Sequence, residues 1–97
     1  MNVFELLLKI EQNRRLYIGD GDIVSLGHFV GGYCFCCQML GVDYKEKDFY
    51  KFTHYVYSIF GETKSISLFR CILENTSTNE EAFQTFFGVL HDFLVLQ

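Results

Sequence analysis

Apolar side chains recur at spacings of three and four residues along almost the whole chain, and proline is absent. This period places them on one face of a helix, so the pattern predicts α-helices nearly throughout. Capping residues and glycines mark the helix ends. The predicted helices cover about residues 2–14, 23–40, 46–60 and 65–75, and a last one begins at Thr78.

The stretch between the first two predicted helices contains two glycines and two aspartates, in the order Gly-Asp-Gly-Asp over residues 19–22. These residue types interrupt the helical period and favour turn geometry. A tight connection is therefore predicted after the arginines at 14 and 15. Either Asp20 or Asp22 is expected to act as the N-cap of the helix that follows.

The segment over residues 23–42 has no charged side chain, and its twenty residues are long enough to cross a membrane. Four glycines and several polar residues lower its hydrophobicity, and aspartates flank it in place of the usual basic and aromatic anchors. We therefore predict a central helix that its neighbours bury, and keep a small membrane-inserted helix protein as an alternative. Gly27 and Gly31 share one face of this helix and would let another helix approach closely.

The last helix has the strongest start signal, the capping box Thr78-Asn-Glu-Glu81. Segment 65–75 has Ser65 as a candidate N-cap. Its Ile-Ser-Leu-Phe start also suits a strand, but a single strand would have nothing to pair with. Together the segments predict an all-α fold: one compact bundle of about five helices, a single domain over residues 1–97, with a radius of gyration of roughly 13 Å.

Charge and composition narrow the functional classes. Eight Lys and Arg against twelve Asp and Glu give a formal net charge of −4, which disfavours nucleic acid as a partner. No basic segment followed by an apolar run begins the chain, so no export signal is expected. Three of the four cysteines lie within residues 34–37, so they cannot form disulfides that link distant parts of the chain. Because disulfides are not expected, the sequence predicts a cytoplasmic protein with reduced thiols.

The most conspicuous chemical cluster is Cys34-Phe-Cys-Cys37. On a helix Cys34 and Cys37 share a face, and with His28 and Cys71 they define the alternative function, a metal- or redox-sensing helical domain. These residues lack the spacing of a zinc site, and free cysteine commonly packs as a small hydrophobe, so no metal or other cofactor is expected. The three histidines have no serine or cysteine arranged with them as a nucleophile pair, so no enzymatic activity is predicted.

Acidic residues gather beside the predicted helix starts. Negative charge there offsets the helix dipole, so capping explains the acids adequately. The same acids can steer a basic partner, and tyrosine is enriched at protein interfaces, so an interaction role is equally open. The candidate exposed tyrosines are Tyr44, Tyr50, Tyr55 and Tyr57.

A family resemblance begins at Arg14-Arg-Leu-Tyr-Ile-Gly19, which a short turn separates from Ser25-Leu-Gly-His-Phe-Val-Gly-Gly-Tyr33. This block resembles a pattern in small all-helical bacterial immunity proteins of contact-dependent growth inhibition and polymorphic toxin systems (CdiI-like). Phe49, Phe52 and Tyr55 continue the resemblance in a Phe-rich third helix, and the acidic start of the last helix extends it over nearly the whole chain. The motif positions are filled by Arg15, Tyr17, Gly19, Leu26, Phe29, Gly32 and Tyr33.

The resemblance implies a cytoplasmic immunity protein that binds and neutralises a cognate toxin domain, and many such toxins are nucleases. An acidic inhibitor suits this role, because carboxylates can occupy a basic channel in place of phosphates. We expect no nucleic-acid or membrane partner, and leave a homo-oligomer open. The candidate partner-binding residues are Asp20, Asp22, Asp43, Tyr44, Asp48, Tyr50, Glu80 and Glu81. The candidate fold determinants are Arg15, Tyr17, Gly19, Gly32 and Tyr33, with glycines for turns or close approach and the arginine for helix-end carbonyls.

Overall fold

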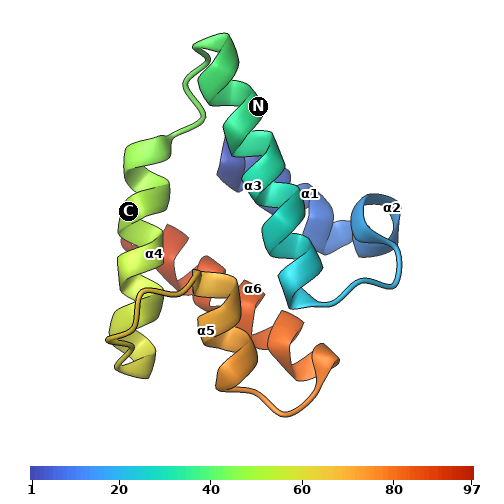
Figure 1. Ribbon diagram of the computed structural model, residues 1–97, viewed down its shortest axis with the longest axis vertical. Helices are drawn as coiled ribbons and strands as arrows, with labels where there is room; N and C mark the ends of the chain where they lie inside the picture. The colour runs from blue at the N-terminus through green and yellow to red at the C-terminus, as the bar shows by residue number, and fades with distance from the viewer.

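The computed structural model describes residues 1–97 and contains six α-helices (Figure 1). They are α1 (Val3–Gln12), α2 (Arg14–Ile18), α3 (Ile23–Leu40), α4 (Glu46–Phe60), α5 (Leu68–Glu74) and α6 (Asn79–Leu96). The predicted all-α bundle is confirmed, and its radius of gyration is 12.9 Å. Twenty-two buried residues form the hydrophobic core, and none of them is charged.

Helix α2 is the sixth helix, and it lies where the sequence pattern predicts only a tight connection. The chain leaves α1 at Asn13, with φ −151° and ψ 65°, and one further helical turn follows. Gly19 ends α2 with φ +60°, a conformation that glycine adopts without steric cost. Five residues are too few to show a helical period, which is why the pattern does not reveal this helix.

Side-chain caps fix the starts of α1 and α6. The N-cap Asn2 accepts a hydrogen bond from the Glu5 amide, and the Glu5 carboxylate accepts one from the Asn2 amide, which completes a capping box. At α6, Thr78 accepts from the Glu81 amide as predicted, but the Glu81 carboxylate accepts from the Ser77 amide instead. The predicted box at Thr78 is therefore only half formed, and the complete box belongs to α1.

Helix α3 has the predicted bounds, but the predicted burial is wrong. Asp22 caps it by accepting from the Ser25 amide, and Gly41 ends it in the left-handed conformation. Only four of its eighteen residues are buried: Ile23, Leu26, Val30 and Cys37. Its length and apolar composition would also allow it to cross a membrane. Neighbours cover one side of α3, and the opposite side faces solvent although it carries no charge.

Helix α4 also has the predicted bounds, whereas α5 begins at Leu68, three residues later than predicted, with Ser67 as its cap in place of Ser65. The Ile-Ser-Leu-Phe segment that also suited a strand forms a loop followed by the first turn of α5. Helical spacing places Ile59 on one apolar stripe of α4 with Phe52 and Val56. Phe52 and Val56 lie in the core, but Ile59 is 46% exposed.

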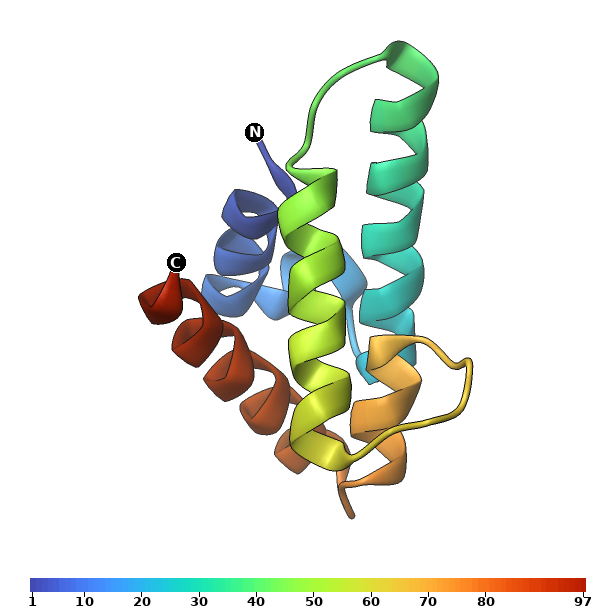
Figure 2. The same ribbon diagram turned by 90° about the vertical axis from the view of Figure 1, so that its left-hand side faces the viewer.

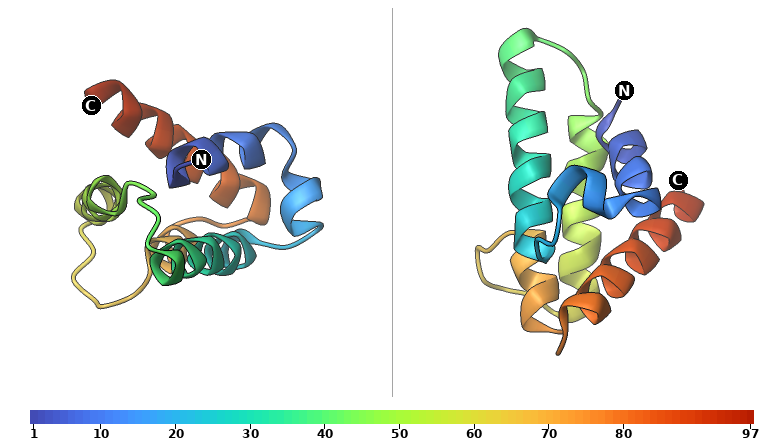
Figure 3. Two further views of the ribbon diagram at one scale, coloured as in Figure 1. Left: turned by 90° about the horizontal axis from the view of Figure 1, so that it is seen from above. Right: turned by 90° about the vertical axis from the view of Figure 1, so that its right-hand side faces the viewer.

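The arrangement of the helices leaves α3 on the outside. Helices α3 and α4 are joined by residues 41–45 at one end and bridged at the other end by α5, and they make little direct contact with each other (Figure 1). Seen from above, α1 and α6 lie on one side of the molecule and α3 on the other (Figure 3). In Figure 2, α4 crosses the front of the molecule, with α3 on one side of it in the view and α1 and α6 on the other. The core fills the space that these helices enclose.

The cap of α3 predicts a pH dependence of stability. The hydrogen bond from the Ser25 amide lowers the pKa of Asp22 below its ordinary value of 3.8. Because the folded-state pKa is depressed, this contribution is present above the ordinary value and is lost as the pH falls through the folded-state value. Urea unfolding between about pH 5 and pH 2.5 should show a smaller loss of stability for Asp22→Asn, which keeps an acceptor, than for the wild type. Equal losses would contradict this role.

Candidate functional site

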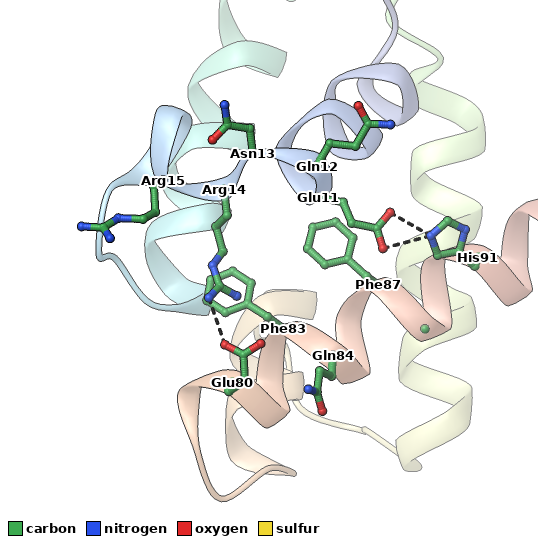
Figure 4. Close-up of a pocket in the computed structure, with 11 residues that line it drawn as sticks. Glu11, Gln12, Asn13, Arg14, Arg15, Glu80, Phe83, Gln84, Phe87 and His91 are labelled. Atoms are coloured by element: carbon green, nitrogen blue, oxygen red, sulfur yellow. Dashed lines mark hydrogen bonds and ion pairs between the residues drawn. The ribbon is translucent and has the colours of Figure 1, made fainter.

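A polar hollow lies between the α1–α2 junction and α6 (Figure 4). Its volume is about 680 Å³, and we call it the polar hollow. The charged and ionisable side chains that line it are Glu11, Arg14, Arg15, Glu80 and His91. Two segments separated by more than sixty residues in sequence therefore share one concave surface.

Arg14 is the central contact across the hollow. Its guanidinium carbon lies 4.0 Å from the centre of the Phe83 ring, and its Nη2 atom lies 3.0 Å from Oε2 of Glu80. The aromatic face and the carboxylate together orient the planar guanidinium group, which attaches α2 to the first turns of α6. Figure 4 shows Arg14 lying over the ring and pointing toward Glu80.

A second pair closes the opposite side of the hollow. Nε2 of His91 lies 2.8 Å and 3.1 Å from the two carboxylate oxygens of Glu11. Outside the rim, Arg15 pairs with Asp20 at 3.3 Å, and both side chains are largely exposed. Exposed pairs of this kind exchange readily with other charged groups, because solvent screens them and they contribute little to stability.

The structure separates the predicted acidic residues into two groups. Asp20, Asp22, Glu80 and Glu81 lie at the end of the molecule that holds the polar hollow. Asp43 and Asp48 flank the start of α4, beyond the far end of α3. An eighteen-residue helix is about 27 Å long, so one compact partner site does not contain both groups.

The predicted tyrosines differ in exposure. Tyr50 is 66% exposed, as an interface residue requires, but Tyr44 is 4% exposed, so its prediction as an exposed anchor is wrong. Gln38 donates a hydrogen bond to the Tyr44 hydroxyl, and burial raises the pKa of that hydroxyl. Tyr55 and Tyr57 are half-buried, and the Tyr57 hydroxyl donates to the Ile66 carbonyl. Tyr44 belongs to the α3–α4 connection, which lies against the N-terminal segment, where the Val3 amide donates to the Tyr44 carbonyl. This long-range contact, which the sequence does not reveal, places Tyr44 in the core.

The candidate fold determinants have varied surroundings. Tyr17 packs edge to face against Phe29, and the Tyr33 hydroxyl donates to the Met1 carbonyl. Arg15 pairs with a carboxylate and makes none of the expected bonds to helix-end carbonyls. Nothing lies within 4 Å of a Cβ built at Gly32, so no close approach occurs there within the chain.

The cysteines are all free, and they differ in accessibility. Cys37 and Cys71 are buried, Cys34 is half-buried and Cys36 is exposed. Burial raises the pKa of Cys34 and of Cys71 to about 11 in each case. No group of three or more His, Cys, Asp or Glu side chains comes together in a way that could hold a metal ion.

These differences predict selective thiol chemistry. At about pH 8, Cys36 should react with a thiol reagent first, because the thiolate is the reactive form and only this thiol is exposed. Mass spectrometry of peptides after a short exposure to iodoacetamide measures the order. The Cys36→Ser variant should lose the fast phase, and a fast phase that persisted would contradict the assignment.

A second concave feature, an apolar groove between α3 and α4, was not predicted from the sequence. Its volume is about 500 Å³, and no charged side chain lines it. Gly31 and Cys34 of α3 face Phe49 and Thr53 of α4 across it. The uncharged run over residues 23–42 is the signal that could have revealed it, because a helix with no charge on its outer side exposes apolar surface.

The polar hollow and the apolar groove are thus two concave features that can support a functional assignment. Comparisons with protein-family models, curated proteins and solved structures find no match. The chemistry of the side chains therefore carries the assignment. The hollow offers carboxylates and two arginines to a charged partner, whereas the groove offers uncharged apolar surface.

Proposed function

We propose that this chain is an immunity protein that binds and neutralises a cognate bacterial toxin domain in the cytoplasm. The polar hollow and the acids around it support this proposal, because Glu11 and Glu80 line one concave surface and Asp20, Asp22 and Glu81 lie at the same end of the molecule. A hollow with carboxylates in and around it can receive projecting lysine or arginine side chains of a protein partner. In this role the chain is a binding protein without catalytic activity or a cofactor.

The charge at this end of the molecule favours a basic partner. Two arginines, Arg14 and Arg15, lie among more numerous carboxylates, and Arg14 is already held by Glu80 and Phe83. A nuclease toxin has a basic substrate channel because it binds phosphates, so acidic side chains can occupy that channel. The carboxylates at this end are Glu11, Asp20, Asp22, Glu80 and Glu81.

The direct test co-expresses this chain with the C-terminal toxin domain encoded by the gene immediately upstream. We expect a complex that survives affinity co-purification, and cells that grow despite the toxin. Absence of both the complex and the growth rescue would contradict the proposed function.

Paired charge reversals test the site itself. Asp20→Lys together with Glu80→Lys should slow association with the toxin domain by at least about tenfold at low salt, because charges at an interface rim mainly steer encounter. Asp43→Lys with Asp48→Lys is the matched control, since it makes the same charge change at the other end of α3 and should leave the rate little changed. Asp22 stays intact because it caps α3. A larger effect of the control pair would place the interface at the start of α4.

A further inference from the structure

The outer face of α3 is an exposed apolar surface without charge. We define the α3 face by residues that helical spacing places side by side: Val24, His28, Gly31, Gly32, Phe35 and Met39. Phe35 is 61% exposed and Met39 is 72% exposed. Contiguous apolar surface of this kind usually marks an interaction site.

The apolar groove adjoins this face, and α5 shows how such a groove is filled. At one end of the groove the Phe69 ring of α5 covers Gly27 so closely that a Cβ built there would lie 2.8 Å from Phe69 Cδ2. One helical turn further along, Gly31 also lines the groove, yet nothing lies within 4 Å of a Cβ built on it. The groove therefore has a second glycine position that this chain itself does not cover.

We propose that a second copy of this chain covers the α3 face, in a two-fold symmetric dimer whose axis passes between Gly31 and Gly32. These adjacent glycines are the two central residues of α3, which has eight residues before them and eight after them. Two antiparallel α3 helices can thus cross at the point where neither has a side chain, which permits close backbone approach.

The symmetry makes the surface complementary to itself. About this axis, Phe35 of one copy lies opposite His28 of the other, and Met39 lies opposite Val24. Val24 and His28 line the groove, while Phe35 and Met39 project beside it. Each copy therefore offers two projecting apolar side chains to the groove of its mate and receives two in return.

The absence of charge on α3 also favours a second copy, and exposed apolar side chains supply part of the area that a dimer would bury. A two-fold axis brings each surface against itself, so charged residues there would repel, but α3 carries none. Tyr50 lies on the same face of α4 as the groove-lining Thr53 and Tyr57. A fully exposed large side chain has an accessible surface of roughly 200 Å². From their exposed fractions, Phe35, Met39 and Tyr50 together expose about 400 Å². This is half of the area that each partner contributes to a standard interface, and the walls of the groove add further area.

Sedimentation equilibrium of the purified chain, with a reductant that prevents a Cys36 disulfide, tests the proposal. At about 100 µM the mass should be twice the 11.3 kDa of one chain. Gly31→Leu should raise the dissociation constant at least about a hundredfold, because its side chain enters the groove and separates the helices. It should still fold, since a Cβ at Gly31 meets open space. Gly88→Leu in α6, which also meets open space, is the matched control and should leave the dimer intact.

A second pair of variants tests the dimer even if the Gly31→Leu variant does not fold. Phe35→Lys should also give monomers, because it places a charge against the mate, whereas Val95→Lys adds the same charge to an exposed residue of α6 and should not. A monomeric wild type, or a dimer in both Gly31→Leu and Phe35→Lys, would overturn the proposal. A wild type that is monomeric in solution and floats with phosphatidylcholine vesicles would overturn it in favour of membrane contact. No toxin domain takes part, so the outcome is separate from that of the proposed immunity function.

Discussion

Replacing Phe52 with alanine is expected to lower the free energy of unfolding by about 3–5 kcal/mol. Phe52 is fully buried, and its ring lies 5.3 Å from that of Phe93, 5.9 Å from that of Phe86 and 6.3 Å from that of Phe4, measured between centroids. The loss combines the transfer free energy of the ring with the cost of a cavity at the meeting point of α1, α4 and α6.

Urea unfolding followed by far-UV circular dichroism measures this change. Ile59→Ala is the matched control in the same helix, because Ile59 is partly exposed and its truncation leaves no enclosed cavity. We expect the control to cost less than about 1 kcal/mol beyond the small effect of helix propensity. Comparable losses for both variants would contradict the placement of Phe52 at the centre of the core.

Gly27→Ala is expected to destabilise the fold by about 1–3 kcal/mol, although alanine is the better helix former. The new Cβ would lie 2.8 Å from Cδ2, 2.9 Å from Cγ and 3.1 Å from Cβ of Phe69. Phe69 cannot easily move away, because it is buried and its ring stacks on that of Phe86 at a centroid distance of 5.3 Å. Helices α3 and α5 would have to separate.

Gly88→Ala provides the opposite expectation for the same chemical change. A Cβ at Gly88 in α6 meets no atom within 4 Å, so alanine should stabilise the fold by up to about 1 kcal/mol. Thermal unfolding of the two variants should therefore shift the midpoint in opposite directions. Stabilisation by Gly27→Ala would show that α5 does not pack on α3 at this glycine.

Local chemistry explains why most helix bounds could be predicted. Asp22 and Gly41 delimit α3 and Gly61 ends α4, and each acts through contacts with residues only a few positions away. Serine can cap a helix at either 65 or 67, so local chemistry did not decide where α5 begins. Helix α2 was missed because its five residues are too few for an apolar position to recur with the helical period.

The features that the sequence did not predict depend on contacts between distant segments. The polar hollow requires Arg14 to reach Glu80. The burial of Tyr44 requires the α3–α4 connection to lie against the N-terminal segment, where the Val3 amide donates to the Tyr44 carbonyl. The exposure of α3 follows from the small number of neighbours available to cover it. Periodicity identifies an apolar face, but it does not show how much of that face other helices reach.

The position of α6 in the fold has a consequence for biosynthesis. The ribosome releases α1 to α5 before α6, yet Phe86 and Phe93 of α6 complete the core around Phe4 and Phe52. Until α6 emerges, the nascent chain exposes those aromatic rings together with the uncharged surface of α3. Such a chain is prone to aggregate and to recruit chaperones, so stable folding is expected to follow the synthesis of α6 instead of accompanying that of the earlier helices.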